Sequence, residues 1–241
     1  MTHEPYTRSA DVYDVIYQWV DYPGDAASII AAIRAHKPAA QSLLEIGCGT
    51  GAYLAEFAAH FDVVGVDVSA EMLAVAAERF PDLRLEESDM LDLDLGRRFD
   101  AVACLFSTIG YMTNLADLAS ALGRMRDHLE PGGVMIVDPW FDPDSYMPGH
   151  IGADVFRGDG IIVSRSSYGD VEDGVSVMEM DHVVIQENIG RAHFVERHRM
   201  GLFTEAQYTA ILGDLGLDVH RVATPWQGRY RLFASDGLSS T

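Results

Sequence analysis

The chain has 241 residues, of which 37 are acidic and 17 basic, so its formal net charge is −20 at pH 7. This charge repels phosphate backbones and the basic residues are scattered, which excludes nucleic acid as a partner. No apolar run reaches the roughly 18 residues that a membrane span needs, and no signal-peptide pattern opens the chain. We therefore expect one soluble, cytoplasmic globular domain that carries an insertion.

Cysteine and lysine are too rare to support several kinds of chemistry. The two cysteines, Cys48 and Cys104, cannot build a disulfide framework or a thiolate zinc site. Lys37 is the only lysine, and it lies beside a proline in an apparent connector, which excludes a pyridoxal-phosphate enzyme. We also predict no metal site, because His193 and His198 are five residues apart on a predicted strand and face opposite sides.

The first predicted elements are two helices within residues 9–36, separated by Tyr22-Pro23-Gly24. From residue 42, short apolar runs alternate with amphipathic segments, which is typical of βαβ units on a parallel sheet. This pattern predicts an α/β fold with a doubly wound sheet and a ligand crevice at the carboxyl ends of its strands. The predicted strands are residues 42–46, 63–66, 83–86, 101–105 and 134–137, and the helices between them are residues 53–60, 70–80 and 115–129.

Residues 139–200 differ in character, because they are rich in Val, Ile, Tyr and Ser and carry two glycine-containing turn signals. They predict three or four inserted antiparallel strands. A helix then begins at Thr204 with Gln207 completing a capping box, and two apolar runs close the main sheet antiparallel. The predicted units are a helical N-terminal lid (1–40), a core (41–138 and 201–235) and an antiparallel β insertion (139–200) through which we expect a homodimer.

The most informative segment is Glu45-Ile46-Gly47-Cys48-Gly49-Thr50-Gly51, at the end of the first predicted strand. Its alternate glycines let the backbone turn tightly and approach a ligand without interference from a Cβ atom. A dinucleotide fold is the competing interpretation, with Ala52 where its third glycine would stand. Glu45 argues against it, because a carboxylate there repels a pyrophosphate and favours a cationic ligand.

Two further acids follow the next two predicted strands. Asp67 ends the second strand, where a carboxylate can accept both hydroxyls of a ribose, and Asp89 follows the third. Asp89 can accept an adenine amino group while Met90 packs on the ring. A lone acid at a strand end is often a helix cap, but acids at three successive strand ends favour a nucleoside site.

As a set, the glycine segment, Asp67, Asp89-Met90 and Leu129-Glu130-Pro131-Gly132-Gly133 resemble the class I S-adenosylmethionine-dependent methyltransferases over residues 42–138. The resemblance implies a Rossmann-like sheet with the glycines under the methionine part of S-adenosylmethionine, Asp67 at the ribose and Asp89 at the adenine. The predicted cofactor-binding residues are Tyr13, Tyr22, Glu45, Gly47, Gly49, Gly51, Asp67, Met72, Asp89, Met90 and Leu105.

Nearly the whole chain resembles the N-methyltransferases that dimethylate nucleotide-linked amino sugars such as desosamine and mycaminose precursors. The resemblance implies that tyrosines of the N-terminal segment close over cofactor and substrate, and that Tyr111 lies beside the acceptor amine. The shared stretches are Asp11-Val12-Tyr13-Asp14, Asp21-Tyr22, Phe106-Ser107-Thr108-Ile109-Gly110-Tyr111, Pro139-Trp140-Phe141 and Gly228-Arg229.

The chain also departs from that family. Relatives are about two residues longer before Tyr22, and they carry arginines in the inserted sheet that pair with the substrate's phosphates, whereas residues 166–178 contain no arginine. A diphosphate needs cationic partners, and only Arg165, Arg229 and Arg231 remain as candidates. An indole or phenol, methylated on carbon or oxygen, is therefore an alternative acceptor.

Methyl transfer needs an aligned, unprotonated nucleophile. For an amine, Tyr17, Tyr111 or Glu179 are the predicted proton acceptors, and for an indole carbon, His182 or Glu179 would polarise the N–H group. Alternatives from another class are an NAD-dependent oxidoreductase and a non-catalytic protein that binds S-adenosylmethionine. The predicted acceptor-binding residues are Tyr6, Trp19, Phe106, Trp140, Phe141, Arg165, Tyr168, Trp226 and Arg229.

Overall fold

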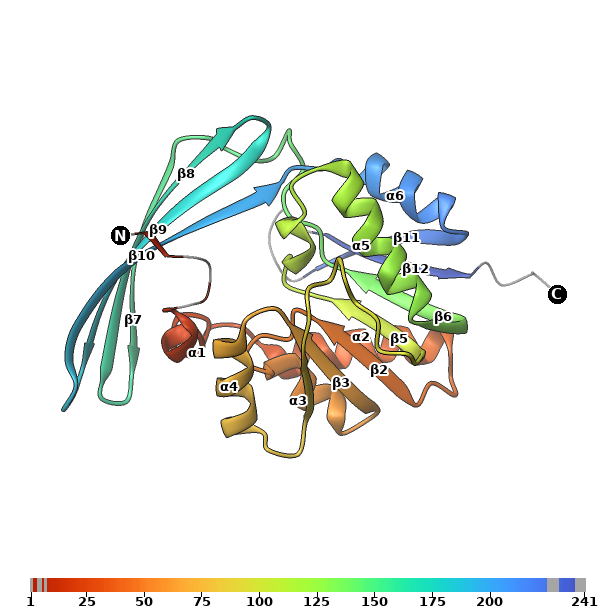
Figure 1. Cartoon of the computed structure of the whole chain (residues 1–241), viewed down its shortest axis with the longest axis horizontal. Helices are drawn as coiled ribbons and strands as arrows, with labels where there is room; N and C mark the ends of the chain where they lie inside the picture. Colours follow the sequence, from red (N-terminus) through yellow and green to blue (C-terminus); the bar gives the residue numbers. More distant parts are fainter. Residues whose placement is uncertain (1, 4–5, 7, 225–229, 237–241) are drawn as a thin grey trace.

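The computed structural model describes residues 2–3, 6, 8–224 and 230–236. Within these residues the chain forms one sheet of seven strands and one of five, with the five-stranded sheet standing to one side of the other (Figure 1). Trp226 and Arg229, which were predicted to contact the acceptor, lie outside the described residues.

The seven-stranded sheet has the order β11-β12-β6-β5-β2-β3-β4 and confirms the predicted doubly wound α/β architecture. The order reverses between β2 and β5, so the ligand crevice is expected at the carboxyl ends of these two strands. Its parallel strands are β2 (Ser42–Ile46), β3 (Asp62–Asp67), β4 (Arg84–Glu87), β5 (Phe99–Cys104) and β6 (Leu129–Val137), and the antiparallel edge consists of β12 (Tyr230–Asp236) and β11 (Leu217–Ala223).

Helices cover both faces of this sheet, and each face has its own buried apolar cluster. One cluster contains α2 (Tyr22–His36) and α3 (Ala52–Ala58), and the other contains α5 (Leu115–Asp127) and α6 (Glu205–Asp214). The predicted capping box of α6 is present, since Thr204 and Gln207 bond each other's backbone N–H groups. In the described part of the chain, no helix is long and apolar enough to cross a membrane.

The insertion forms four long antiparallel strands, which agrees with the three or four strands predicted for residues 139–200. They are β7 (His150–Gly158), β8 (Ile161–Glu172), β9 (Val175–Gln186) and β10 (Gly190–Gly201). A fifth strand, β1 (Thr2–His3), pairs parallel with β10 and was not predicted from the sequence. The N-terminus is thereby tied to the insertion and stands beside β10 in Figure 1.

The N-terminal helices begin and end at different residues from those predicted. A 3-10 turn (Ala10–Val12) leads into the short α1 (Tyr13–Ile16), and Tyr22-Pro23-Gly24 is the first turn of α2 instead of a separator between helices. Proline is tolerated there, because N–H groups of a first helical turn have no intrahelical acceptor. Asp21 caps this turn, with its Oδ1 accepting the Gly24 N–H at 3.0 Å.

Candidate functional site

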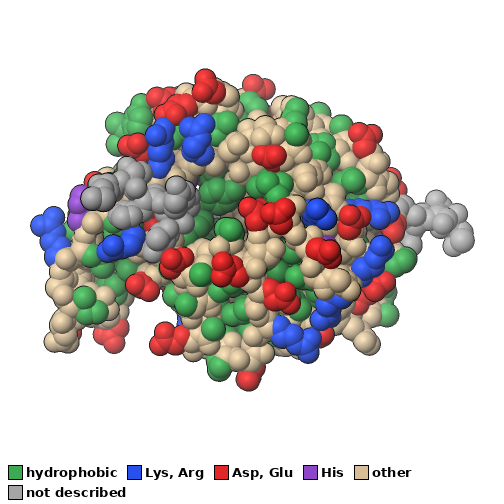
Figure 2. All heavy atoms as spheres, in the orientation of Figure 1, with side chains coloured by type: hydrophobic (Ala, Val, Ile, Leu, Met, Phe, Trp, Pro, Cys, Tyr) green, Lys and Arg blue, Asp and Glu red, His purple; other side chains and the backbone are tan. Residues whose placement is uncertain are grey.

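A cavity with a volume of about 720 Å³ lies at the carboxyl ends of β2 and β3. Figure 2 shows a hollow with hydrophobic side chains at its base near the middle of one face, with acidic side chains spread over the surrounding surface. We call this cavity the first cavity. The predicted cofactor-binding residues that line it are Tyr13, Tyr22, Glu45, Gly47, Gly49, Asp67, Met72, Asp89, Met90 and Leu105.

The glycine loop after β2 forms one wall of the first cavity because its backbone takes conformations that favour glycine. Gly47 has a φ of 70°, and a Cβ atom there would stand 2.2 Å from Thr108 Cγ2. Gly51 has a φ of 80° and is the N-cap of α3, but it does not line the cavity. Gly51 therefore acts on the loop's conformation, and its predicted direct contact with the cofactor is not supported.

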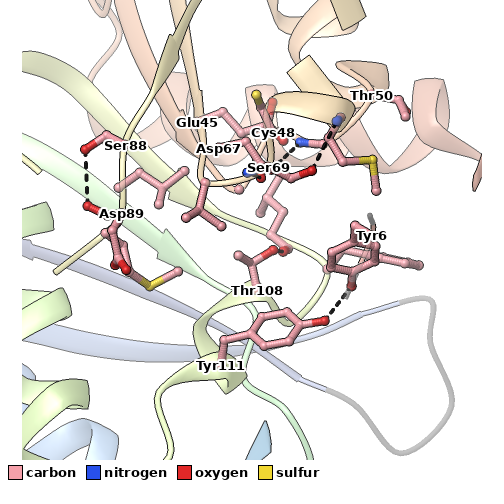
Figure 3. A pocket seen from close by; sticks show the side chains of 18 of the residues that line it. Tyr6, Glu45, Cys48, Thr50, Asp67, Ser69, Ser88, Asp89, Thr108 and Tyr111 are labelled. Atoms are coloured by element: carbon pink, nitrogen blue, oxygen red, sulfur yellow. Dashed lines mark hydrogen bonds between the residues drawn. The ribbon is translucent and has the colours of Figure 1, made fainter. Parts of the chain in front are cut away.

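Asp67, at the end of β3, is held by the backbone of two loops. Its Oδ2 accepts the Gly49 N–H at 2.8 Å and its Oδ1 accepts the Ser69 N–H at 2.9 Å. Burial raises the pKa of Asp67, and these hydrogen bonds act in the opposite direction. Each carboxylate oxygen has a second lone pair, so both remain able to accept a hydroxyl from a ligand (Figure 3).

Glu45 is the most unusual carboxylate of the cavity wall. It is only 2% exposed, and its Oε2 has no hydrogen-bond partner among the described residues. Burial, together with the nearby charge of Asp67, raises the pKa of Glu45 well above its ordinary value. An unpaired buried carboxylate is costly, so this side chain is prepared for a cationic partner in the cavity.

A second cavity of about 290 Å³ adjoins the first and lies under the inserted sheet. Tyr6, Phe106 and Tyr111 line both cavities and therefore form the wall between them. Phe106 and Ser107 have φ angles of 52° and 68°, which residues with side chains adopt rarely. The predicted acceptor and catalytic residues that line the second cavity are Tyr6, Tyr17, Trp19, Phe106, Tyr111, Trp140 and Phe141, and the inserted sheet adds Met178, Met180, His198 and Met200.

Four predicted residues of the insertion line neither cavity. Glu179 is exposed and stands in register with Tyr168, which is 47% exposed and bonds Asp170. His182 is buried but stacks on Phe194 at a ring distance of 4.8 Å, farther along β9 than the cavity. Arg165 pairs with Asp154 at 3.4 Å. The catalytic roles predicted for Glu179 and His182 are therefore corrected, as are the acceptor contacts predicted for Tyr168 and Arg165.

Arg231, a candidate phosphate partner, is likewise unavailable to a ligand. It is 3% exposed, and its guanidinium group bonds Asp25 and Asp138. Two other arginines take positions that were not foreseen. Arg197 and Arg199 of β10 line the first cavity, and both pair with Glu172, at 2.6 and 3.1 Å.

Comparison with known proteins identifies the family of this chain. A methyltransferase-domain family model matches residues 43–133. A dTDP-3-amino-3,6-dideoxy-alpha-D-glucopyranose N,N-dimethyltransferase of Streptomyces fradiae is 40% identical over 213 residues, which cover 87% of this chain and 84% of that protein. This chain belongs to the same family of S-adenosylmethionine-dependent methyltransferases.

Solved structures of the same family agree with the fold of this methyltransferase. DesVI of Streptomyces venezuelae is 37% identical, with a TM-score of 0.90 over 96% of this chain and 99% of that chain. CalS10, an amino pentose methyltransferase of Micromonospora echinaspora whose structure has S-adenosylmethionine bound, is 34% identical, with a TM-score of 0.84 over 94% of this chain and 97% of that chain. The predicted class I methyltransferase fold and cofactor are confirmed.

The residues of the first cavity fit S-adenosylmethionine. The cofactor carries an ammonium group, a ribose and an adenine, and the cavity offers an unpaired buried carboxylate at Glu45, an anchored carboxylate at Asp67 and the Asp89-Met90 pair. A Cβ atom at Gly49 would meet nothing within 4 Å, so open space lies beside the loop. The acids of the first cavity thus match in kind the hydrogen-bond donors that S-adenosylmethionine carries.

His198 is a further residue to which the sequence analysis assigned no function in the site. It is 4% exposed, lines the second cavity, and its Nδ1 lies 2.8 Å from Tyr111 Oη. As their odd spacing predicts, His193 lies on the opposite face of β10, where it is exposed beside Asp181. Strand alternation was the sequence signal that could have identified His198. It places Glu196, His198 and Met200 on the inward face of β10, and a buried histidine on that face needs a polar partner.

Proposed function

We propose that this methyltransferase transfers a methyl group to the amino nitrogen of a nucleotide-linked amino sugar. The observation that carries the proposal is the pair of adjoining cavities, because the wall of Tyr6, Phe106 and Tyr111 separates a nucleoside-type site from an aromatic acceptor site. The names of the relatives support the substrate class, since the Streptomyces fradiae relative is an N,N-dimethyltransferase of a dTDP-linked amino sugar.

Arg197 and Arg199 support a substrate that carries phosphate. The stretch 166–178 lacks the arginines expected from the family resemblance, but Arg199 stands in register with Val177 on the neighbouring strand, and Arg197 with Glu179. Both guanidinium groups are partly exposed at Glu172. A diphosphate carries more negative charge than the Glu172 carboxylate, and its oxygens can accept bidentate hydrogen bonds from the guanidinium groups of Arg197 and Arg199.

The proposed chemistry asks little of the protein beyond binding and alignment. S-adenosylmethionine supplies an electrophilic methyl group when it is bound. We propose that Glu45 binds its ammonium group, Asp67 its ribose hydroxyls, and Asp89 with Met90 its adenine. The acceptor amine must be neutral to be nucleophilic, and the aromatic second cavity favours this form because burial disfavours a charged ammonium. The shared wall holds the nitrogen near the methyl group and excludes water.

The proposal is tested by assaying labelled methyl transfer from S-adenosylmethionine to three acceptor classes, namely dTDP-linked amino sugars, indoles and phenols. We expect transfer to the amino sugars, with the new methyl on nitrogen in the product's NMR spectrum. Transfer to an indole or phenol with none to an amine would replace the proposed substrate by the aromatic alternative. Binding of S-adenosylhomocysteine without transfer to any class would favour a non-catalytic protein.

We expect proton release from Glu45 to accompany cofactor binding. Because the pKa of Glu45 is raised well above its ordinary value, this carboxyl keeps its proton to higher pH in the free protein, and a bound ammonium group expels it. Cofactor affinity should therefore fall as the pH is lowered through this raised pKa. Calorimetry in two buffers of different ionisation enthalpy measures the released proton.

The matched variants are Glu45→Gln and Glu71→Gln, because Glu71 lines the same cavity but is exposed. Glu45→Gln should abolish the proton release and weaken binding about ten-fold, the scale of one hydrogen bond to a charged group. Glu71→Gln should retain the release. A Glu45→Gln protein that still released a proton would remove Glu45 from the ammonium site.

A further inference from the structure

The first cavity has an acidic lining that is interrupted by two arginines of β10. Within the described part of the chain, the basic residues of its wall are Arg197 and Arg199, which we call the arginine pair. His198, between them in sequence, lines the second cavity, so this part of β10 borders both cavities. The acidic residues that line the first cavity are Glu45, Asp67, Glu71, Asp89 and Asp117. An anionic part of a ligand is therefore repelled by most of this wall and attracted by the arginine pair.

One carboxylate occupies both members of the arginine pair. Glu172 Oε1 accepts a hydrogen bond from Arg197 Nη2 at 2.6 Å, and Glu172 Oε2 accepts one from Arg199 Nη1 at 3.1 Å. Each oxygen serves one arginine, as two oxygens of a phosphate group would if they bridged the same pair. Arg197 Nε is buried and has no hydrogen-bond partner among the described residues. Glu172 therefore leaves part of the hydrogen-bonding capacity of the arginine pair unused.

Glu172 can leave the arginine pair without a change in the inserted sheet. It is the last residue of β8, and the turn that follows consists of Asp173 and Gly174, whose φ angles of 52° and 77° are those of a tight hairpin. The Glu172 side chain is 47% exposed, so rotation about its own torsions moves the carboxylate into water. Because partly exposed ion pairs contribute little free energy, a ligand with more negative charge can replace this carboxylate.

We propose that Glu172 is a specificity-determining residue: it occupies the arginine pair in the free enzyme as a resident anion, and the diphosphate of the substrate displaces it. This inference rests on the proposed function and adds a competitor to it. A diphosphate carries a negative charge on each phosphate and offers an oxygen pair to each guanidinium group. A ligand with a single carboxylate offers the arginine pair no more than Glu172 does, so it gains nothing by the exchange.

The test measures the binding of dTDP-glucose, which carries the diphosphate but no amine, by isothermal titration calorimetry at saturating S-adenosylhomocysteine. Glu172→Gln removes the negative charge and keeps an amide oxygen that can accept from an arginine, so the arginine pair stays in place. We expect this variant to bind dTDP-glucose about five-fold more tightly than wild type, which is the scale of a partly exposed ion pair.

A double-mutant comparison shows whether Glu172 acts through the arginine pair. Replacing Arg197 and Arg199 together by Gln should weaken the binding of dTDP-glucose at least about ten-fold, because the hydrogen bonds from charged donors to the diphosphate are lost. In this background, Glu172→Gln should produce almost no further change, since the groups for which Glu172 competes are absent.

Glu179→Gln is the matched control for the removal of one negative charge. Glu179 is exposed on the neighbouring strand in register with Arg197, and in the described structure it forms no ion pair with either arginine. Its variant should tighten binding by at most about two-fold, because exposed charges without a direct contact are screened. Equal gains from Glu172→Gln and Glu179→Gln would overturn the inference in favour of a general effect of charge.

The remaining outcomes separate this inference from the proposed function. If Glu172→Gln binds dTDP-glucose no more tightly than wild type while methyl transfer to a dTDP-linked amino sugar is intact, Glu172 supports the arginines and the inference alone fails. If wild type transfers no methyl group to such a sugar, the proposed function fails. If dTDP-glucose binds neither to wild type nor to Glu172→Gln, both fail.

Discussion

Asp67→Ala is expected to abolish measurable binding of S-adenosylhomocysteine. The substitution removes the two oxygens that we propose accept the ribose hydroxyls, each worth about 1.5–3 kcal/mol for a hydrogen bond to a charged group, so affinity should fall at least 100-fold. It also removes the carboxylate that holds the Gly49 and Ser69 N–H groups, so the glycine loop loses its anchor. Isothermal titration calorimetry measures the affinity, and a thermal-shift titration reports it independently.

Asp67→Asn is the control that separates charge from geometry. Its amide oxygen can accept one hydroxyl, and its NH₂ group cannot accept the second, so we expect an intermediate affinity. Wild-type protein should be stabilised by S-adenosylhomocysteine and not by NAD. Unchanged affinity in Asp67→Ala would place the cofactor elsewhere in the first cavity, and stabilisation by NAD alone would contradict the assignment of the cofactor.

The sheet and the grouping of the glycine loop, Glu45 and Asp67 around the first cavity were predictable because their signals are local in sequence. The glycine segment and Glu45 lie on seven consecutive residues, and the sheet brings Asp67 beside them because successive parallel strands end at one edge. Turn chemistry also identified the strands of the insertion and the capping box at Thr204. These features depend on the local conformational preferences of short stretches of chain, and tertiary contacts do not override those preferences here.

The acceptor side was less predictable because it depends on contacts distant in sequence. Alternation places Met178, Met180 and His182 on one face of β9, but it does not reveal that Met178 and Met180 line the second cavity and His182 does not. His198 meets Tyr111 from a separation of 87 residues. The positive φ angles of Phe106 and Ser107 were also not predictable, because neither residue is a glycine or an asparagine, the types that commonly adopt such angles.

Those φ angles are supported by a buried ion-pair network around Arg231. The Arg231 Nε lies 2.5 Å from Asp138 Oδ1, and its NH1 and NH2 groups bond Asp25 at 3.0 and 2.9 Å. Asp138 Oδ2 also accepts the Phe106 N–H at 3.1 Å, which ties the network to the wall between the cavities. Burial alone would lower the pKa of Arg231, but the two carboxylates raise it, so the guanidinium stays charged.

Arg231→Met is therefore expected to destabilise the folded protein strongly. It leaves the buried carboxylates of Asp25 and Asp138 without their shared cation, which costs about 3–5 kcal/mol of the free energy of unfolding in urea titrations. Adding Asp25→Asn and Asp138→Asn removes both negative charges and should recover part of the lost stability.

The matched surface control is Arg221→Met, which removes an exposed ion pair with Glu205 and should cost at most about 1 kcal/mol of the free energy of unfolding. Equal losses for the two arginine variants would show that the buried network contributes no more than a surface ion pair.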